Sequence, residues 1–418
     1  MRPGLERIRA LLAACGEPQR AVSLVQVSGT NGKGSVCAMV ESVLRAAGFA
    51  TGLYTSPHLV AFTERIRFRG EPVGEAEADA LAAELIPAAD EIASGGAGPP
   101  TYFEFMTAMA FLHFARRGAD FALIETGLGG RFDAASAAEA PVAAVTSIGL
   151  DHTAVLGGTI EEIAAEKAGI IAGGASVVCG EMPDAAFGVI ARAAAMKRAT
   201  VLRVGDDILY SVLDESPERT VLEVAGRLGR FGPLALPLAG RHQASNCAAA
   251  CGIIGELRGR GAAIDDGAVA RGMAGVRWPG RMQILGRSPL VLVDCAHNTD
   301  GARAAASAAA ALFPGARWAL VLGVLADKDA GGICEAFAPV ASAAFLTPLP
   351  SPRSADPSAV AAHWRACGGA RPEIAPCPGE AFERARRAVE TGGADGVFTA
   401  GSIYLVGEVM RMMGAAAV

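Results

Sequence analysis

The sequence lacks the features that mark several specialised classes of protein. Its nine cysteines include no Cys-x-x-Cys pair, which disfavours a zinc site or a disulfide framework and indicates a reducing compartment. No dense run of lysine or arginine occurs and the net charge is −6, so a nucleic-acid partner is not expected. Segment 1–7 has no apolar signal core, and no window approaches the apolar run of a membrane-spanning helix. We therefore expect a cytoplasmic protein without nucleic-acid or membrane partners.

Aromatic residues are also few, at 6%, although 51% of the residues are hydrophobic. This balance indicates a globular chain in which helices pack on sheets through small residues. A length of 418 residues is too great for one ordinary core, so two domains are expected. The turn-forming segment Arg-Trp-Pro-Gly-Arg at 277–281 divides the chain, and we place the domains at residues 1–276 and 277–418.

In the N-terminal domain, apolar runs typical of buried strands alternate with stretches typical of helices. Strands are expected at 21–27, 49–54, 121–125 and 142–148, helices at 35–47, 75–92, 103–117 and 159–168, and a Gly/Pro loop at 95–100. This alternation predicts a P-loop-type, doubly wound, mostly parallel sheet with helices on both faces. Between 201 and 236, short strands follow one another without helices, which predicts a small antiparallel sheet before a helix at 243–258.

The alternation resumes after the segment at 277–281. Strands are expected at 290–294, 318–324, 343–347 and 396–399, and a helix at 299–312. The pattern predicts a smaller, Rossmann-like C-terminal domain, so the fold class is α/β throughout.

The most specific motif is the glycine-rich loop Ser-Gly-Thr-Asn-Gly-Lys-Gly-Ser at 28–35. It lies where a predicted strand ends and a helix begins, so its N–H groups and the helix N-terminus can bind phosphate oxygens. Lys33 would reach the β- and γ-phosphates of ATP, and Ser35 would lie near Mg²⁺. The loop departs from the general P-loop pattern because Gly34 separates Lys33 from Ser35. The predicted nucleotide-binding residues of this loop are Gly29, Thr30, Asn31, Gly32, Lys33, Gly34 and Ser35.

A carboxylate at the end of another strand complements this loop. Glu125 ends the apolar run 121–125, and a carboxylate at the C-terminal edge of a parallel strand faces the ligand crevice. Alone, Glu125 would be an ordinary strand-end acid. Together with the P-loop, it is a candidate Mg²⁺ ligand.

Taken in order, these motifs resemble the folylpolyglutamate synthase/dihydrofolate synthase family, of the bacterial bifunctional type, within the Mur ligase superfamily. The resemblance runs from Ser28 to the Ala-Gly-Ser segment at 400–402, and the family uses the extra glycine of the P-loop. It implies an ATP-dependent ligase that forms an amide bond with the help of two Mg²⁺ ions. The implied metal ligands are Ser35, Ser56 in the Thr-Ser-Pro-His-Leu segment, Glu125 and His152.

The resemblance also implies a pterin-binding region. The Thr-Tyr-Phe-Glu segment at 101–104 is similar to the family segment that contacts this substrate, and aromatic rings suit a flat heterocycle. Without the resemblance, a helix start with core aromatics would be the simpler interpretation. The family usually continues Asp-Ala-Thr-Asn where this chain has Asp-Ala-Ala-Ser at 133–136. The implied substrate-binding residues are Thr101, Tyr102, Phe103, Glu104, Phe132, Asp133 and Ala134.

Other positions match through the resemblance alone. Lys167 stands where the family carries a carbamylated lysine, although an unmodified Lys167 could pair with a neighbouring glutamate. Asn246, Arg281 and Asp294 match ATP-binding positions, the last two in the second domain. A guanidinium suits phosphate charge and a carboxylate suits ribose hydroxyls. The implied catalytic residues are Lys33, His152 and Lys167.

The implied reaction begins with phosphorylation of a carboxylate of dihydropteroate or a reduced folate by ATP. The amine of L-glutamate then attacks the acyl phosphate. We also expect the enzyme to be a monomer. Three alternatives stay open: a Mur-type ligase acting on a cell-wall nucleotide, a P-loop NTPase without ligation, and a non-enzymatic binding module. The segment around Tyr102 and the extra Gly34 disfavour the first, and the second domain disfavours the NTPase.

Overall fold

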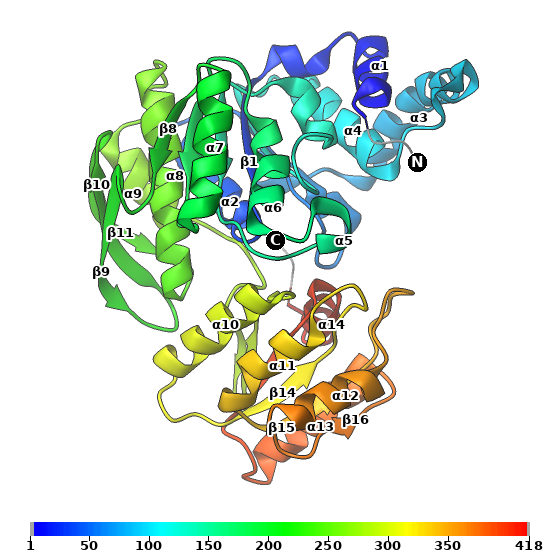
Figure 1. The fold of residues 1–418 in the computed structure, drawn as a ribbon, viewed down its shortest axis with the longest axis vertical. Helices are drawn as coiled ribbons and strands as arrows, with labels where there is room; N and C mark the ends of the chain where they lie inside the picture. The colour runs from blue at the N-terminus through cyan, green and yellow to red at the C-terminus, as the bar shows by residue number, and fades with distance from the viewer. Residues whose placement is uncertain (1–3, 416–418) are drawn as a thin grey trace.

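The computed structural model describes residues 4–415, so the first three residues of segment 1–7 and the last three of the expected domain 277–418 lie outside it. The described chain forms two α/β bodies, one around an eight-stranded sheet and one around a six-stranded sheet (Figure 1). Helices α5 and α14 lie along the boundary between them (Figure 1). None of the helices in residues 4–415 combines the length and the apolar character that crossing a membrane requires.

The eight-stranded sheet is parallel except at one edge. Its order is β4-β3-β2-β5-β1-β6-β7-β8, and the antiparallel pairs are β2–β3 and β3–β4. Side chains of β1 point alternately to two cores, with Val25 and Val27 on one face and Leu24 on the other. The strands are β1 Ser23–Ser28, β2 Thr51–Tyr54, β3 Ile66–Phe68, β4 Glu71–Pro72, β5 Phe121–Glu125, β6 Val142–Val145, β7 Ser176–Cys179 and β8 Thr200–Arg203.

Helices cover both faces of this sheet. They are α1 Glu6–Ala14, α2 Lys33–Ala46, α3 Glu75–Ile92, α4 Tyr102–Arg116, α5 Thr153–Leu156, α6 Ile160–Lys167, α7 Asp184–Met196, α8 Arg241–Gly259 and α9 Asp266–Ala274. Shorter 3-10 turns lie at Pro18–Ala21, Phe62–Arg65, Ala134–Ala138 and Ala168–Ile170, and another, Ala338–Val340, lies in the C-terminal body. Helix α2 is buried along nearly its whole length because it packs against the sheet, α8 and α9. Thr159 caps α6 through a reciprocal hydrogen-bond pair with Glu162, as a threonine at this position predicts.

The three-stranded antiparallel sheet is present, but it begins later than expected. It has the order β11-β10-β9, with β9 Ile208–Glu215, β10 Thr220–Gly226 and β11 Gly229–Leu236. The start at 201 was wrong, because β8 joins the large sheet in parallel with β7. The prediction missed β7 altogether. It also extended one strand to 148, whereas β6 ends at Val145 and the chain then turns toward the glycine-rich loop.

The C-terminal body has the strand order β12-β13-β17-β14-β15-β16. Its strands are β12 Gln283–Arg287, β13 Leu290–Val293, β14 Trp318–Leu322, β15 Ala341–Leu346, β16 Glu373–Ile374 and β17 Gly396–Ala400. Its helices are α10 Thr299–Leu312, α11 Ala330–Phe337, α12 Pro357–Ala366, α13 Pro378–Glu390 and α14 Ile403–Met412. The edge strand β12 runs antiparallel to β13 and was not predicted, because its residues are only partly buried.

Helix α9 ends at Ala274 and strand β12 begins at Gln283, and the described residues between them form no helix or strand. Residues 275–282 therefore link the two bodies and are called the junction below. The division at 276/277 falls inside the junction and stays a prediction. The expected Gly/Pro loop at 95–100 starts inside a π-helical turn, Ala93–Ala97, that prolongs α3.

Candidate active site

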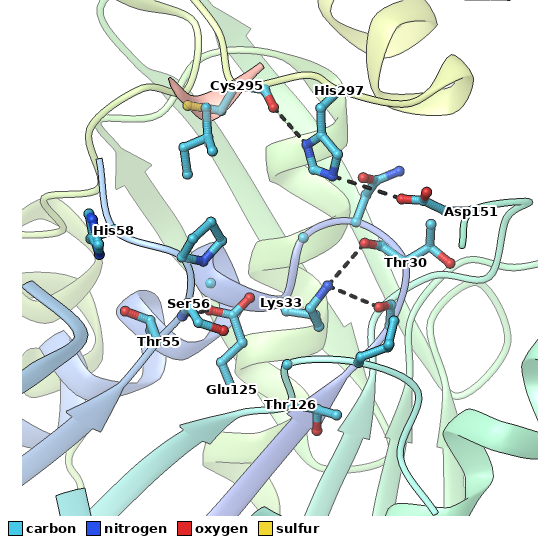
Figure 2. A pocket seen from close by; sticks show the side chains of 18 of the residues that line it. Thr30, Lys33, Thr55, Ser56, His58, Glu125, Thr126, Asp151, Cys295 and His297 are labelled. Carbon is cyan, nitrogen blue, oxygen red and sulfur yellow. Dashed lines mark hydrogen bonds and ion pairs between the residues drawn. The ribbon is translucent and has the colours of Figure 1, made fainter. Parts of the chain in front are cut away.

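A cavity of about 310 Å³ lies between the two bodies. The loops that follow β1, β2, β5 and β6 line it from one side, and the junction, the loops after β13 and β14 and the start of α14 line it from the other. Figure 2 shows how side chains from these segments converge. This location agrees with the rule that parallel α/β sheets bind ligands beyond the carboxyl ends of their strands.

The glycine-rich loop takes a backbone shape that only glycine adopts readily. Gly29 and Gly32 have φ values of 145° and 86°, and a β-carbon on Gly29 would lie 2.0 Å from Oγ1 of Thr146. Lys33 begins α2 and curls back, so that its Nζ donates to the carbonyl oxygens of Gly29 and Thr30 at 3.1 Å (Figure 2). The loop therefore presents an ammonium group and the N-terminus of a long helix to the cavity.

Three further residues of the predicted nucleotide site belong to this loop or lie against it. The hydroxyl of Ser35 is buried and has no hydrogen-bond partner among residues 4–415. Asn246 on α8 lies opposite Gly32, where a β-carbon would come within 2.3 Å of its Oδ1. Thr30 is fixed by hydrogen bonds with the backbone of Gly149.

Glu125 ends β5 inside the cavity, as expected from the sequence. Its Oε2 accepts the backbone N–H of Ser56 at 3.1 Å (Figure 2). Burial raises the pKa of Glu125, and Lys33, the Ser56 N–H and Arg281 partly offset that effect. A buried carboxylate of this kind is more stable as an anion when a cation lies beside it.

The donors at this point suit Mg²⁺, which prefers oxygen ligands. Ser56 and Glu125 line the cavity and supply a hydroxyl and a carboxylate oxygen. Ser35 does not line it, but its hydroxyl is buried without a hydrogen-bond partner among residues 4–415 and would be a further oxygen ligand for an ion. No group of three His, Cys, Asp or Glu residues that could hold a metal occurs within 4–415. That finding is compatible with Mg²⁺, which proteins commonly bind through one or two carboxylates together with substrate phosphates.

Lys167 reaches the cavity from the end of α6 and is 5% exposed. Its Nζ donates to the carbonyl of Gly29 at 2.9 Å, so Lys167 and Lys33 share one acceptor. Burial, with the charge of Lys33, lowers the pKa of Lys167 to about 7. An appreciable fraction of the side chain is therefore a neutral amine near neutral pH.

Lysine is rare elsewhere in this chain. The sequence has four lysines, and three of them line the cavity: Lys33, Lys167 and Lys328. The basic residues outside it are almost all arginine. Lysine differs from arginine in having a compact ammonium group whose pKa shifts readily on burial, so this distribution follows the chemistry of the site.

The sequence-based analysis missed a polar cluster that joins the two bodies. Lys328 Nζ, from the C-terminal body, donates to Asp151 Oδ1 at 2.5 Å, and Asn298 Nδ2 donates to Asp151 Oδ2 at 2.9 Å. Asn298 also exchanges amide hydrogen bonds with Asn31 of the glycine-rich loop. Burial raises the pKa of Asp151, but Lys328 and Asn298 outweigh it and hold that pKa below its ordinary value.

His152 lines the same cavity beside this cluster. Its Nε2 lies 3.2 Å from Lys328 Nζ, and burial lowers the pKa of the imidazole in spite of the adjacent Asp151. A neutral imidazole is the form that binds metals. Its predicted role as a metal ligand is consistent with this state and stays a prediction.

Arg281 and Asp294 occupy different positions relative to the cavity. Arg281 lines it and faces Glu125 closely enough to influence its pKa. Asp294 does not line it, because its two carboxylate oxygens accept the backbone N–H groups of Met282 and Ala296 at 2.8 Å. Asp294 therefore holds the junction against β13, and its predicted contact with ATP stays untested.

The segment expected to bind the pterin lies next to the cavity and does not line it. Thr101 and Glu104 form the reciprocal cap of α4, and Glu104 also pairs with Arg7. Tyr102 is 60% exposed, with the Arg65 guanidinium 5.5 Å from its ring centre. Phe103 packs against Tyr54 and against Gly127, which lines the cavity. The substrate contacts predicted for 101–104 remain predictions.

The second predicted substrate segment supports the cavity wall. Asp133 is buried and accepts the N–H groups of Gly127, Leu128 and Ala135, so it fixes the loop after β5. Burial raises the pKa of Asp133 to about 6, although these N–H groups act against it. Phe132 is half exposed and Ala134 is buried. Contact between these residues and a substrate also stays a prediction.

Comparison with protein families gives two matches that together cover most of the chain. Residues 27–254 match the Mur ligase middle domain, and residues 280–403 match the Mur ligase, glutamate ligase domain. The gap between the two matches, residues 255–279, contains the first part of the junction.

Individual relatives agree with these matches. The dihydrofolate synthase/folylpolyglutamate synthase of Escherichia coli is 35% identical over 99% of this chain and 92% of its own length. A structure of Mycobacterium tuberculosis folylpolyglutamate synthase complexed with ADP and AMPPCP has 36% identity and a TM-score of 0.93, over 99% of this chain and 96% of that one.

A probable bifunctional folylpolyglutamate synthase/dihydropteroate synthase of Haloferax volcanii is 37% identical over 98% of this chain. The chain spans about half the length of that relative and of a similar one from Halobacterium salinarum. The similarity therefore covers only one part of these two longer proteins.

Proposed function

The chain belongs to the folylpolyglutamate synthase/dihydrofolate synthase family of Mur ligases, and from this premise we propose that it is an ATP-dependent ligase that forms amide bonds with L-glutamate. The proposed acceptors are the carboxylates of dihydropteroate and of reduced folates. The observation that carries the proposal is the cavity between the two bodies, where Lys33, Glu125 and Arg281 converge from three separate segments.

The phosphate chain of ATP would bind along the glycine-rich loop. Lys33 Nζ now donates to two loop carbonyls, and phosphate oxygens would be stronger acceptors for it. Arg281 approaches from the junction and would bind phosphate charge from the opposite side. The ADP and AMPPCP complexes of the Mycobacterium tuberculosis relative support ATP as the nucleotide.

Ser35, Ser56 and Glu125 would hold Mg²⁺, with His152 at a second position. When bound, Mg²⁺ would supply positive charge that offsets the negative charge developing on the phosphate oxygens during transfer. The protein itself supplies the geometry of the site. The N–H of Ser56 orients Glu125, and Asp151 with Lys328 restrains the segment that carries His152.

The reaction needs an activated carboxylate because an oxyanion is a poor leaving group. Transfer of the γ-phosphoryl group of ATP to the acceptor carboxylate gives an acyl phosphate and ADP. The amine of L-glutamate attacks the acyl carbon, the C–O bond to phosphate breaks, and the amine loses a proton. We propose that residues 277–418 bind L-glutamate and that contact between the two bodies excludes water from the acyl phosphate.

The acceptor would lie toward the loops after β2 and β5. Phe103 packs against Gly127 at this end of the cavity. The rings of Tyr102 and Phe132 are exposed, and we propose that they contact the flat heterocycle of the acceptor. Lys167, as a neutral amine, could take up carbon dioxide and become a carbamate whose negative charge would assist metal and phosphate positioning. Carbamylation of Lys167 is part of the proposal.

Mass spectrometry of products tests the function directly. The enzyme is incubated with ATP, Mg²⁺ and L-glutamate, and with either dihydropteroate or a reduced folate as acceptor. We expect a mass increase of one glutamate and the release of ADP and phosphate only when both cosubstrates are present. Phosphate release that is independent of L-glutamate and acceptor, without any adduct, would identify an NTPase and refute the proposal.

A matched pair of variants links the reaction to the site. Lys33→Ala removes the ammonium group of the glycine-rich loop and should abolish product formation. Lys197→Ala removes the one lysine that does not line the cavity and should leave product formation intact. Equal loss in both variants would separate the activity from the cavity.

A further inference from the structure

Gly34 has no backbone reason to be glycine. It lies in the first turn of α2 with an ordinary helical φ, in contrast to Gly29 and Gly32, whose positive φ values favour glycine. Glycine is also less favourable than alanine inside a helix. Another physical requirement must therefore explain why this position carries no side chain.

The indole of Trp278 supplies that requirement. A β-carbon on Gly34 would lie 2.6 Å from Cζ2 of Trp278, 3.1 Å from Cε2 and 3.3 Å from Nε1. A contact of 2.6 Å is shorter than those that real β-carbons make, so the indole lies directly against the backbone of the glycine-rich loop. The Arg67 guanidinium lies 5.6 Å from the ring centre and packs on the same side chain.

Ring contacts, and no hydrogen bond within residues 4–415, hold the indole in this place. Its Nε1 is buried and has no hydrogen-bond partner within residues 4–415. A ring that is held by contact will move when the surface beneath it changes. The position of Trp278 therefore depends on the absence of a side chain at Gly34. In turn, the ring of Trp278 leaves no room for a side chain at position 34.

The junction that carries Trp278 is attached to the C-terminal body as well. Asp294 accepts the N–H of Met282, the side chain of Gln283 accepts the N–H of Gly280, and the carbonyl of Gly280 accepts the N–H of Cys295. Arg281 lies within this restrained segment, three residues after Trp278, and lines the cavity. The junction thus contacts the phosphate loop at one end and the second body at the other.

We propose that Trp278 is a positioning residue for the nucleotide site. Its indole, packed on the backbone of Gly34, sets the spacing between the loop that carries Lys33 and the junction that carries Arg281. The extra glycine of this P-loop is present to accommodate that ring. The inference rests on the proposed nucleotide site, and it adds a residue whose effect on ATP passes through the loop geometry.

The test is a double-mutant cycle measured by calorimetric binding of ADP and of a non-hydrolysable ATP analogue to the full chain. Gly34→Ala should weaken binding by about tenfold or more, because the added methyl overpacks the contact with the ring. Trp278→Leu removes the atoms that clash. Gly34→Ala/Trp278→Leu should therefore bind nucleotide to within about threefold of Trp278→Leu alone.

A matched cycle at a neighbouring glycine provides the control. A β-carbon on Gly32 would meet Asn246 and not Trp278. Gly32→Ala should weaken nucleotide binding, and Trp278→Leu should not restore it. If Trp278→Leu restored nucleotide binding to both Gly34→Ala and Gly32→Ala, its effect would not depend on contact with position 34, and the proposal would be wrong.

The outcomes separate this proposal from the proposed function. If the wild-type chain binds no nucleotide, the proposed function itself fails. Two other results would refute the claim that glycine at position 34 accommodates the ring of Trp278. One is that Gly34→Ala binds nucleotide as well as the wild type, and the other is that the double variant binds no better than Gly34→Ala. Normal affinity in Gly34→Ala would also show that the ring tolerates a side chain.

A second measurement decides the matter if Gly34→Ala fails to fold, which its thermal midpoint without nucleotide will reveal. In Trp278→Leu, the KM for ATP should rise by about threefold or more while the KM for L-glutamate stays unchanged. Parallel changes in both constants would indicate a general structural role for Trp278 and overturn its assignment to the nucleotide site.

Discussion

Replacing Asp151 by asparagine should destabilise the contact between the two bodies. Asp151 and Lys328 have side chains only 8% and 4% exposed, and they join the bodies by a hydrogen bond of 2.5 Å. Asp151→Asn removes the negative charge and leaves the Lys328 ammonium buried without a counter-ion. Removing one partner of a buried ion pair typically costs about 3–5 kcal/mol of unfolding free energy.

The size of the thermal shift follows from the length of the chain. An unfolding entropy of about 2.1 cal/mol/K per residue gives roughly 0.9 kcal/mol/K for a protein of 418 residues. If both bodies unfold together, the midpoint should fall by about 3–6 °C. Calorimetry and urea unfolding followed by circular dichroism would measure the midpoint and the free energy.

Two further variants make the measurement specific. Asp151→Asn/Lys328→Met removes both charges and should be more stable than Asp151→Asn alone, because no unpaired charge remains. Asp395→Asn removes the partner of Arg317 in an exposed ion pair and should hardly move the midpoint. The reasoning is refuted if Asp151→Asn melts like the wild type, or if adding Lys328→Met lowers the midpoint further.

The stabilisation that the Asp151–Lys328 pair contributes depends on pH in a predictable direction. The pKa of Asp151 in the folded protein lies below its ordinary value, so its carboxylate binds protons less readily than in the unfolded chain. The stabilisation is therefore fully present at neutral pH and down to the unfolded value of about 4. It is lost only as the pH falls through the lower pKa of the folded state.

Three other predictions concern the chemistry of the cavity. Lys33→Ala should reduce product formation below detection while circular dichroism shows an unchanged fold, and near-normal turnover would contradict the nucleotide site. Ser35→Ala should raise the Mg²⁺ concentration needed for half-maximal activity by about tenfold or more, because it removes the buried hydroxyl, and an unchanged titration would exclude this ligand. Activity should fall as the pH drops below about 7, because protonated Lys167 cannot react with carbon dioxide. In addition, ¹³C NMR with labelled bicarbonate should show a carbamate signal that is missing in Lys167→Arg. A spectrum without that signal, in a fully active enzyme, would rule out carbamylation.

Local features of this protein could be predicted from the sequence because neighbouring residues decide them. The glycine-rich loop between β1 and α2 needs only a buried strand, glycines at positive φ and a helix start, and all of these are encoded within 23–46. Glu125 at the end of β5 follows from the same logic, since a parallel strand delivers its last side chain to the ligand edge. The two α/β bodies and the antiparallel sheet also follow from periodicity.

Features that depend on distant partners could not be predicted in this way. The edge strand β12 has little apolar patterning, and its pairing with β13 depends on the position of the junction. Thr101 and Glu104 are matched to a substrate-binding segment by resemblance, yet the folded chain uses both side chains to cap α4. A local motif does not reveal which of two roles a polar side chain takes.

The sequence by itself determined the class of the fold, the phosphate loop and the carboxylate that faces it. Only the tertiary structure showed that Asp151, Asn298 and Lys328 join the two bodies, and that Trp278 packs on Gly34. Asp151 and Lys328 are 177 residues apart, and no periodicity or spacing connects them. Their pairing is decided by the position of one body against the other, because a contact between bodies depends on the packing of the whole chain and not on the residues near either partner.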